Sequence, residues 1–240
     1  MPWFYDIAER DHELQNPTSP EKIRLLGERL RLGPESRVLD LACGKAGPAL
    51  LLAGAFGCRV LGVERASEFA EIARERVQAA GLTDRIEILE GDAAAFPLEP
   101  GAWDAVLCLG ASFVWHGLEG TLAALSPAVA SGGHVVVGEP FWRAWPLPEG
   151  VDDAGYLPLR ETVARIESAG LALVALIASS EDDWDTYESL HWQALESWLA
   201  EHPRDPDTVV IRERHEAQRE AYLRHERALF GWAIFVGRVP

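Results

Sequence analysis

The sequence contains few cysteines and no long apolar run. Its three cysteines, Cys43, Cys58 and Cys108, are too few and too scattered for a disulfide framework or a zinc site. We therefore predict no metal and a reducing, cytoplasmic location. No apolar stretch approaches the roughly 20 residues that a membrane span needs. The acidic start at residues 1–6 lacks the basic and apolar regions of a signal peptide, so we expect no membrane partner.

Basic residues are also scarce. The chain has 22 lysines and arginines against 38 acidic residues, which gives a formal net charge of -16. Because binding to a nucleic-acid backbone needs a basic surface, nucleic acid is not the expected partner. One arginine-rich run, from Arg212 to Arg227, is interleaved with glutamates and is typical of a solvated, salt-bridged helix face. The charge favours a small-molecule substrate and leaves the oligomeric state open.

Short apolar runs alternate with helix-like runs between residues 37 and 139. Strands joined by helices at this spacing pair in parallel through right-handed crossovers. The expected fold class is α/β, a doubly wound Rossmann-like sheet that binds its ligands at the carboxyl ends of the strands. The predicted strands are Val38–Leu41, Arg59–Glu64, Ile86–Leu89, Ala105–Leu109 and His134–Glu139, and the predicted helices are Pro48–Phe56, Ser67–Ala80 and Leu118–Val129, the last ended by Ser131–Gly133.

The composition changes after Glu139. Phe141–Pro148 is rich in aromatic residues and proline, which predicts a loop or lid. Two long helices are expected between residues 182 and 230, split near Pro203–Pro206. The other elements predicted here are a helix at Leu159–Ala169 and strands at Leu171–Ala178 and Trp232–Val239.

The most informative segment is Val38–Gly47. It has an apolar run, then an acid at Asp40, then small residues, and a helix-forming run follows directly. This order predicts a buried parallel strand, a tight turn and a helix N-terminus. Small residues let a ligand approach the backbone, and the helix start offers free N–H groups. The charge of Asp40 favours a ligand that carries an ammonium group.

This segment resembles the first motif of class I S-adenosylmethionine (SAM) dependent methyltransferases, acid-x-Gly-x-Gly-x-Gly after the first strand. Asp40 and Gly44 match the motif, while Ala42 and Ala46 replace its outer glycines. The resemblance implies a mostly parallel sheet with an antiparallel final strand and a helical cap. It also implies SAM as cofactor and methyl transfer to a small molecule. The implied units are lid helices (1–34), a SAM-binding core (35–180), a helical insertion (181–230) and a final strand (231–240).

The resemblance also assigns cofactor residues at the ends of successive strands. Asp40 balances the methionine ammonium, and the backbone at Ala42 and Gly44 admits the ligand. Glu64 ends the second strand and accepts hydrogen bonds from the ribose diol. Arg65, which follows it, joins the set, although it could simply pair with Glu64. The remaining expected contacts are Asp92 and Ala93 at the adenine, and Leu109 and Gly110 at the sulfonium and methionine.

Two other functions remain open on the sequence. Ala42-x-Gly44-x-x-Gly47 nearly fits the G-x-G-x-x-G motif of NAD(P)-dependent oxidoreductases, and Glu64 lies about twenty residues on, as that motif asks. Against this, Asp40 would place a negative charge near a pyrophosphate, and Asp92 has no standard role there. The other alternative is a SAM- or S-adenosylhomocysteine-binding protein without transfer activity.

The acceptor site is less clearly marked. In-line methyl transfer requires a nucleophile held close to the methyl carbon, and a base only when the acceptor must lose a proton. Glu139, after the fifth strand, and His116, after the fourth, are base candidates, His116 because its ordinary pKa is near neutral. Either could instead be structural. The segment from residue 3 to residue 13 resembles a lid helix, in which Tyr5 or His12 contacts SAM or the acceptor.

Aromatic side chains are frequent in the second half of the chain. An apolar and aromatic stripe runs along the helix after Asp182, with spacing that fits either a buried core face or a ligand wall. If the tryptophans gather around one cavity, the acceptor is apolar, flat or cationic, because aromatic faces attract cationic nitrogen. The stripe is Trp184, Tyr187, His191, Leu195 and Trp198, and the tryptophans considered for the cavity are Trp115, Trp142, Trp184 and Trp192.

Overall fold

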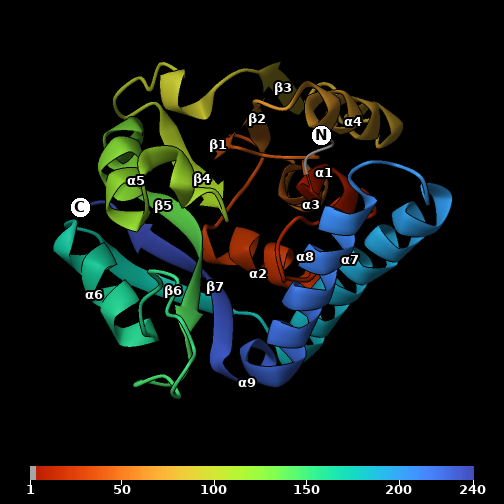
Figure 1. Ribbon diagram of the computed structural model, residues 1–240. Helices are drawn as coiled ribbons and strands as arrows, with labels where there is room; N and C mark the ends of the chain where they lie inside the picture. Colours follow the sequence, from red (N-terminus) through yellow and green to blue (C-terminus); the bar gives the residue numbers. More distant parts are fainter. Residues whose placement is uncertain (1–3) are drawn as a thin grey trace.

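The computed structural model describes residues 4–240, so Trp3 of the expected lid segment lies outside the described residues. A seven-stranded sheet with the order β3-β2-β1-β4-β5-β7-β6 forms its centre (Figure 1). All neighbours pair in parallel except β7, which runs antiparallel to both β5 and β6. This confirms the predicted sheet. The strands are β1 Arg37–Leu41, β2 Arg59–Glu64, β3 Ile86–Glu90, β4 Trp103–Leu109, β5 Val129–Trp142, β6 Ala172–Ala178 and β7 Phe230–Arg238.

Helices cover both faces of the sheet (Figure 1). Successive strand residues point to opposite faces, so Val38 of β1 joins one apolar cluster and Leu39 joins the other. Because both faces are largely buried, the parallel strands are mostly apolar, although β1 contains Asp40 and β3 contains Glu87 and Glu90. The helices α2 Pro20–Arg29, α3 Gly47–Phe56 and α4 Ser67–Ala79 pack on one face, and α5 Leu118–Leu125 and α6 Leu159–Ser168 pack on the other.

A helical segment lies between β6 and β7. It consists of α7 Glu181–Glu201, α8 Thr208–Ala221, a π-helical turn at Tyr222–Glu226 and α9 Arg227–Leu229. Ser180 begins α7 with a reciprocal capping box to Asp183. The first helix, α1 Phe4–Ala8, packs against α7 and α8, which run side by side (Figure 1). The start of the chain is therefore held by residues almost two hundred positions away.

The arginine-rich run on α8 and beyond is a charged surface, as predicted. Arg227 forms ion pairs with Asp185 and Glu181, and Arg224 pairs with Glu220. In addition, the guanidinium of Arg214 lies 4.2 Å from the ring centroid of Phe4. These arginines therefore interact with side chains of the same chain.

The prediction for β5 was wrong at both ends. The strand begins at Val129, so Ser131–Gly133 lies inside it and does not follow the helix. That helix ends at Leu125 and is followed by a 3-10 turn containing Pro127, which lacks the N–H that would continue it. Phe141 and Trp142 are also part of β5, because β7 pairs with them at Gly231 and Phe230. The predicted loop therefore begins only at residue 143. Within residues 4–240, no helix combines the length and apolarity needed to cross a bilayer.

Candidate active site

Asp40 lies in β1 and is a buried acid that forms no ion pair within residues 4–240. Its side chain is 2% exposed, and its Oδ2 atom has no hydrogen-bond partner among residues 4–240. Burial, and secondly the charge of Glu64, raise the pKa of Asp40 to about 7. A buried carboxyl that lacks a partner is costly, and a cationic ligand group would remove that cost. Asp40 therefore fits the ammonium contact predicted for it.

The turn after β1 has an unusual backbone. Ala42, Gly44 and Ala46 all have left-handed φ angles, of 57, 55 and 59°. For alanine this conformation costs about 1–2 kcal/mol, and such strain gathers at ligand sites. Glu64 holds the turn, since its carboxylate accepts hydrogen bonds from the N–H of Gly44 at 2.9 Å and of Ala66 at 2.8 Å. The two alanines thus preserve the geometry for which the family motif uses glycine.

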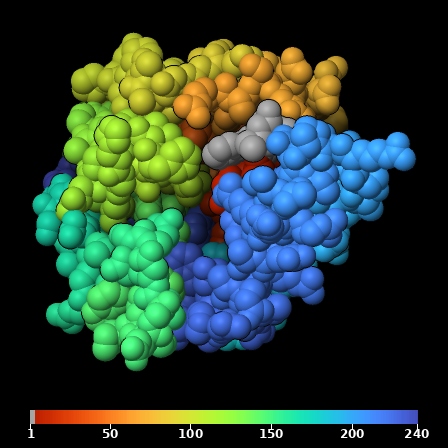
Figure 2. Space-filling view, in the orientation of Figure 1, coloured from red at the N-terminus to blue at the C-terminus, as the bar shows by residue number. Residues whose placement is uncertain are grey.

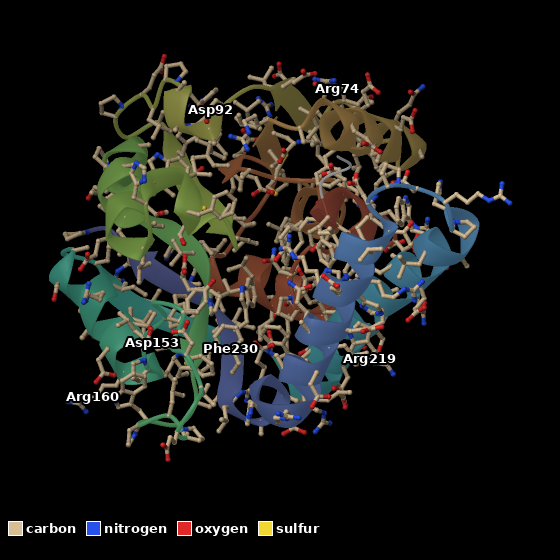
Figure 3. The ribbon with its side chains drawn as sticks, viewed as in Figure 1. Arg74, Asp92, Asp153, Arg160, Arg219 and Phe230 are labelled. Carbon is tan, nitrogen blue, oxygen red and sulfur yellow. The ribbon has the colours of Figure 1, made fainter. Side chains whose placement is uncertain are left out.

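Asp92 follows β3 and is exposed. It accepts a hydrogen bond from the N–H of Ala94 at 3.0 Å and so caps a short 3-10 turn that begins at the buried Ala93. Figure 3 labels Asp92 in the segment after β3. Gly91 donates to the backbone carbonyl of Glu64 at 2.8 Å, which links the ends of β2 and β3. Arg65 is exposed, and no ion pair joins it to Glu64 in the described part of the chain.

Residues 13–16 lie directly on three glycines of this edge. A Cβ atom added at any of the three would come within 2.0 to 2.2 Å of an oxygen atom of this segment. Substitution would therefore displace the segment or the turn. Gly44 and Gly47 belong to the turn after β1, and Gly110 follows β4. The contacts are Gln15 at Gly44, Glu13 at Gly47 and Asn16 at Gly110.

Hydrogen bonds fix the same segment in place. The Oε1 atom of Gln15 accepts from the N–H of Lys45 at 2.8 Å, and Nδ2 of Asn16 donates to the carbonyl of Leu109 at 3.1 Å. The buried ammonium of Lys45 donates to the carbonyl of Glu9 at 2.6 Å. Gln15, Asn16 and Lys45 were missed from the sequence, because their roles depend on contacts thirty or more residues away.

Glu139 stands beside the end of β4. The N–H of Gly110 donates to the carbonyl of Gly138 at 2.9 Å, so the two strand ends are in register. Glu139 is 6% exposed and its Oε1 atom has no partner in the described chain. Burial raises the pKa of Glu139 to about 7, against the opposing effect of the Ser112 side chain. His116 differs: it is exposed and ends a 3-10 turn in the left-handed conformation, at a φ of 61°.

A row of aromatic rings leads away from β5 and β7. Phe230 is labelled in Figure 3. The centroid of its ring lies 4.7 Å from that of Trp142, 5.3 Å from that of Tyr156 and 5.8 Å from that of Trp184. Trp184 in turn lies 6.2 Å from Tyr187. The indole N–H of Trp184 is buried and has no acceptor among residues 4–240. Figure 2 shows a recess in the molecular surface between green atoms of the α5 region and blue atoms of α8.

The four tryptophans do not share one lining. Trp142 and Trp184 belong to the aromatic row, and Trp192 packs at 5.9 Å on Tyr222, which also lies 6.4 Å from Trp184. Trp115 packs against the apolar cluster on the other face of the sheet, because the short turn after β4 directs it there. The stripe on α7 is mainly core, as Trp184, His191, Leu195 and Trp198 are all buried.

Tyr5 and His12 have separate surroundings. Tyr5 is 38% exposed, with the guanidinium of Arg214 at 5.0 Å from its ring centroid. His12 is 2% exposed, and its Nε2 atom lies 2.9 Å from the carbonyl of Tyr187 on α7. Glu9 and His191 complete a polar group around it. A contact of either residue with SAM or the acceptor stays a prediction.

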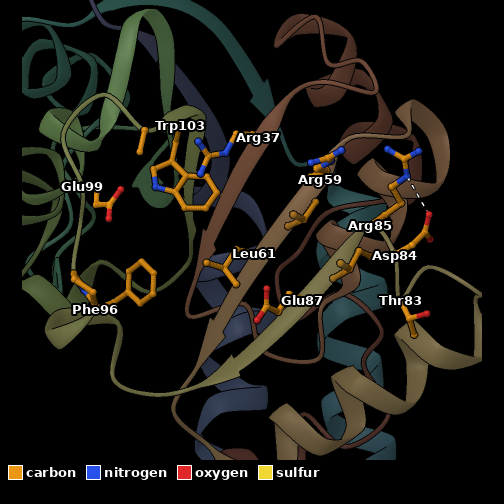
Figure 4. A pocket seen from close by; sticks show the side chains of 14 residues that line it. Arg37, Arg59, Leu61, Thr83, Asp84, Arg85, Glu87, Phe96, Glu99 and Trp103 are labelled. Atoms are coloured by element: carbon orange, nitrogen blue, oxygen red, sulfur yellow. Dashed lines mark ion pairs between the residues drawn. The ribbon is translucent and has the colours of Figure 1, made fainter.

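Another hollow of the described structure lies at a different edge of the sheet. It has a volume of about 500 Å³ and is bordered by residues at the amino ends of β1 to β4 (Figure 4). Arg37 lies over the ring of Trp103 at 4.9 Å, and Arg85 pairs with Asp84. Open α/β sheets bind their ligands at the opposite, carboxyl edge. We therefore place the active site at the edge that holds Asp40 and Glu139.

The fold is that of a Rossmann-like α/β protein, with acids at the carboxyl edge of the sheet, where such folds bind their ligands. A model of the family described as a methyltransferase domain matches residues 38–133. The chain is 31% identical to a SAM-dependent methyltransferase from Thiobacillus denitrificans, solved with S-adenosylhomocysteine, over 100% of this chain and 99% of that one, with a TM-score of 0.93. The chain is also 29% identical to a SAM-dependent methyltransferase from Geobacter sulfurreducens, solved with S-adenosylhomocysteine. That comparison covers 100% of this chain and 99% of the other, with a TM-score of 0.93.

A curated relative, the trans-aconitate 2-methyltransferase of Paracidovorax citrulli, is 33% identical over 66% of this chain and 63% of its own length. The chain belongs to the class I SAM-dependent methyltransferases. It uses SAM as cofactor and transfers a methyl group to a small molecule. These findings favour the methyl donor over the dinucleotide and over a binding protein without activity.

Proposed function

We propose that the acids at the strand ends hold SAM at the carboxyl edge of the sheet. In this arrangement Asp40 balances the methionine ammonium, Glu64 accepts from the ribose hydroxyls and Asp92 accepts from the adenine amino group. Each oxygen of Glu64 already accepts one backbone N–H and has a second lone pair available. The unpartnered, buried Oδ2 atom of Asp40 is the observation that carries this assignment. When bound, SAM supplies an electrophilic methyl group on a sulfonium.

The remaining cofactor residues support this placement. The backbone at Ala42, Gly44 and Ala93 approaches the ligand, and Leu109 and Gly110 face its methionine end. Gly110 has a left-handed φ of 78°, and Asn16 of the segment 13–16 packs directly on it. Arg65 is exposed and lies at the rim of the site. The segment over these glycines then acts as a lid that excludes water from the transfer.

Glu139 is proposed as the residue that orients the acceptor and takes its proton. A raised pKa of about 7 suits a base that works near neutral pH. The buried Oε1 atom has no protein partner among the described residues, so its hydrogen-bonding capacity is left for a ligand. His116, Tyr5 and His12 are weaker candidates, His116 because it is exposed and His12 because it is enclosed by protein groups.

The acceptor is proposed to be a flat or cationic small molecule. Trp142, Phe230, Trp184 and Tyr187 form an aromatic wall that begins beside β5, and aromatic faces attract cationic nitrogen. The net charge of -16 adds to this preference. The free indole N–H of Trp184 would donate to an oxygen or nitrogen of the acceptor. The helices from residue 181 to residue 230 would serve as the cap that carries this wall.

A transfer assay with methyl-labelled SAM tests both parts of the proposal. The panel contains aromatic amines, aliphatic tertiary amines, flat phenols and polycarboxylic acids. We expect label in the amines or phenols, and weaker transfer in Trp184→Phe but not in Trp103→Phe, which changes a tryptophan at the opposite edge. Transfer only to polycarboxylic acids would reject the acceptor class and leave methyl transfer intact.

The three cysteines are buried and unpaired, which supports the expected reducing, cytoplasmic location.

A further inference from the structure

Three potential metal ligands meet between the start of the chain and α7. Glu9 and His12 lie three residues apart in one turn after α1, and His191 lies on α7. All three are at least nine-tenths buried. One ligand atom of each lies within 4.8 Å of those of the other two. The cluster was not predicted, because the sequence near residue 10 does not indicate a contact with residue 191.

The hydrogen bonds of the cluster leave two acceptor atoms facing each other. The Nε2 atom of His12 lies 2.9 Å from the carbonyl of Tyr187, and since a carbonyl only accepts, this nitrogen carries the hydrogen. The lone pair is then on Nδ1, which is 3.6 Å from Oε2 of Glu9. Both atoms are buried and neither has a donor among residues 4–240. Two unpaired buried acceptors side by side are unfavourable unless a cation lies between them.

The geometry is that of a metal site with its outer contacts already formed. Two ligand atoms about 2.1 Å from a tetrahedral ion are about 3.4 Å apart, close to the separation of the His12 and Glu9 atoms. A backbone carbonyl on the other ring nitrogen is the usual support of a metal-binding histidine. Glu9 is supported in the same way, because the hydroxyl of Tyr187 donates to its Oε1 atom at 2.7 Å.

We propose that Glu9, His12 and His191 bind one divalent transition-metal ion, of the zinc type, that joins the N-terminal segment to α7. The Nε2 atom of His191, now 3.0 Å from Oε1 of Glu9, would bind the ion as the neutral ring with its hydrogen on Nδ1, which lies 3.9 Å from Oε1 of Glu188. Two histidines and one carboxylate are a set that zinc and cobalt accept, and a fourth position stays open. Since the carbonyl of Glu9 also holds Lys45 of the cofactor turn, the ion would fasten the lid over SAM.

The test uses full-length protein stripped with a chelator. Zn²⁺ titration by calorimetry and the visible absorption of added Co²⁺ report uptake directly, without a methyl acceptor. We expect one ion per chain, and binding weakened at least about 100-fold in His12→Ala and in His191→Ala. His202→Ala is the matched control, because His202 stacks on Trp198 at the end of α7, outside the cluster, and should bind as the wild type does.

Two further measurements decide the location and the effect. Anomalous diffraction from wild-type crystals soaked in Zn²⁺ should place the ion between the three side chains, even if a variant does not fold. Hydrogen exchange at residues 9–17 should slow about tenfold or more when Zn²⁺ is added. No stoichiometric uptake, an ion located elsewhere, or equal loss of binding in His202→Ala would each overturn the proposal.

Discussion

The two halves of the sheet contribute in different ways to the proposed site. In the cofactor half, β3-β2-β1-β4, the site residues come from one continuous stretch between Asp40 and Gly110. In the acceptor half, β5-β7-β6 and the helices on it, they come from residues 139, 184 and 230 and from the start of the chain. The matching family model covers residues 38–133, essentially the first half. Local turns thus carry the residues proposed for the cofactor, and long-range packing brings together those proposed for the acceptor.

Glu139→Gln tests the acceptor half and should give the largest effect. Removal of the carboxylate takes away the proposed base, so kcat should fall about 100-fold or more, while binding of S-adenosylhomocysteine changes less than about twofold. The rate of the wild type should also fall below pH 7, where a carboxyl with a pKa of about 7 becomes protonated. The measurement is the transfer assay with an acceptor found above. Glu87→Gln, at the opposite edge of β3, is the control, and equal effects on kcat and binding would make Glu139 a structural residue.

Glu64→Ala tests the cofactor half and should weaken binding of S-adenosylhomocysteine by about 1–3 kcal/mol, or about 5–150-fold. The loss includes the ribose contacts and the support that Glu64 gives to Gly44. Calorimetry measures the dissociation constant. Glu90→Ala, the exposed acid that ends β3, should leave it unchanged. An unaltered dissociation constant in Glu64→Ala would remove this residue from the cofactor site and weaken the distinction between the two halves of the sheet.

Asp40→Asn tests whether the cofactor half senses pH. In the free protein the pKa of Asp40 is raised to about 7, and a bound ammonium would stabilise the carboxylate and lower it again. Below pH 7 binding must therefore expel a proton, so affinity should fall by up to about tenfold from pH 8 to pH 6. Calorimetry across this range should show the slope in the wild type and none in Asp40→Asn. A slope that persists in the variant would assign the effect to another group.

Asn16→Ala tests the lid between the halves and should have the smallest effect. It removes one hydrogen bond, to the carbonyl of Leu109, worth about 0.5–1.5 kcal/mol. We expect S-adenosylhomocysteine to dissociate about 2–10 times faster, because the segment opens more readily. Stopped-flow fluorescence, using the many tryptophans, measures this rate. Gln193→Ala, an exposed amide on α7, should behave as the wild type.

The same contrast explains which features could be predicted from the sequence. The strand Arg59–Glu64 was predicted to the residue, because an apolar run between turn residues fixes a buried strand locally. Phe141 and Trp142 were assigned to a loop, since only their pairing with β7, ninety residues later, makes them a strand. The acids Asp40, Glu64 and Asp92 could be proposed from the sequence for the first reason. Gln15, Lys45 and the cluster of Glu9 with His191 were missed for the second.

The position of β7 has a consequence for how the chain folds. It follows every other strand in the sequence, yet it lies between β5 and β6. The apolar strand Ala172–Ala178 therefore has no neighbour to pair with until residues 230–238 have been synthesised. Until then its unpaired edge is open to other chains, so a nascent or truncated protein should depend on chaperones. Completion of the acceptor half is thus the last event in the biogenesis of this enzyme, while the half that binds SAM can already be assembled.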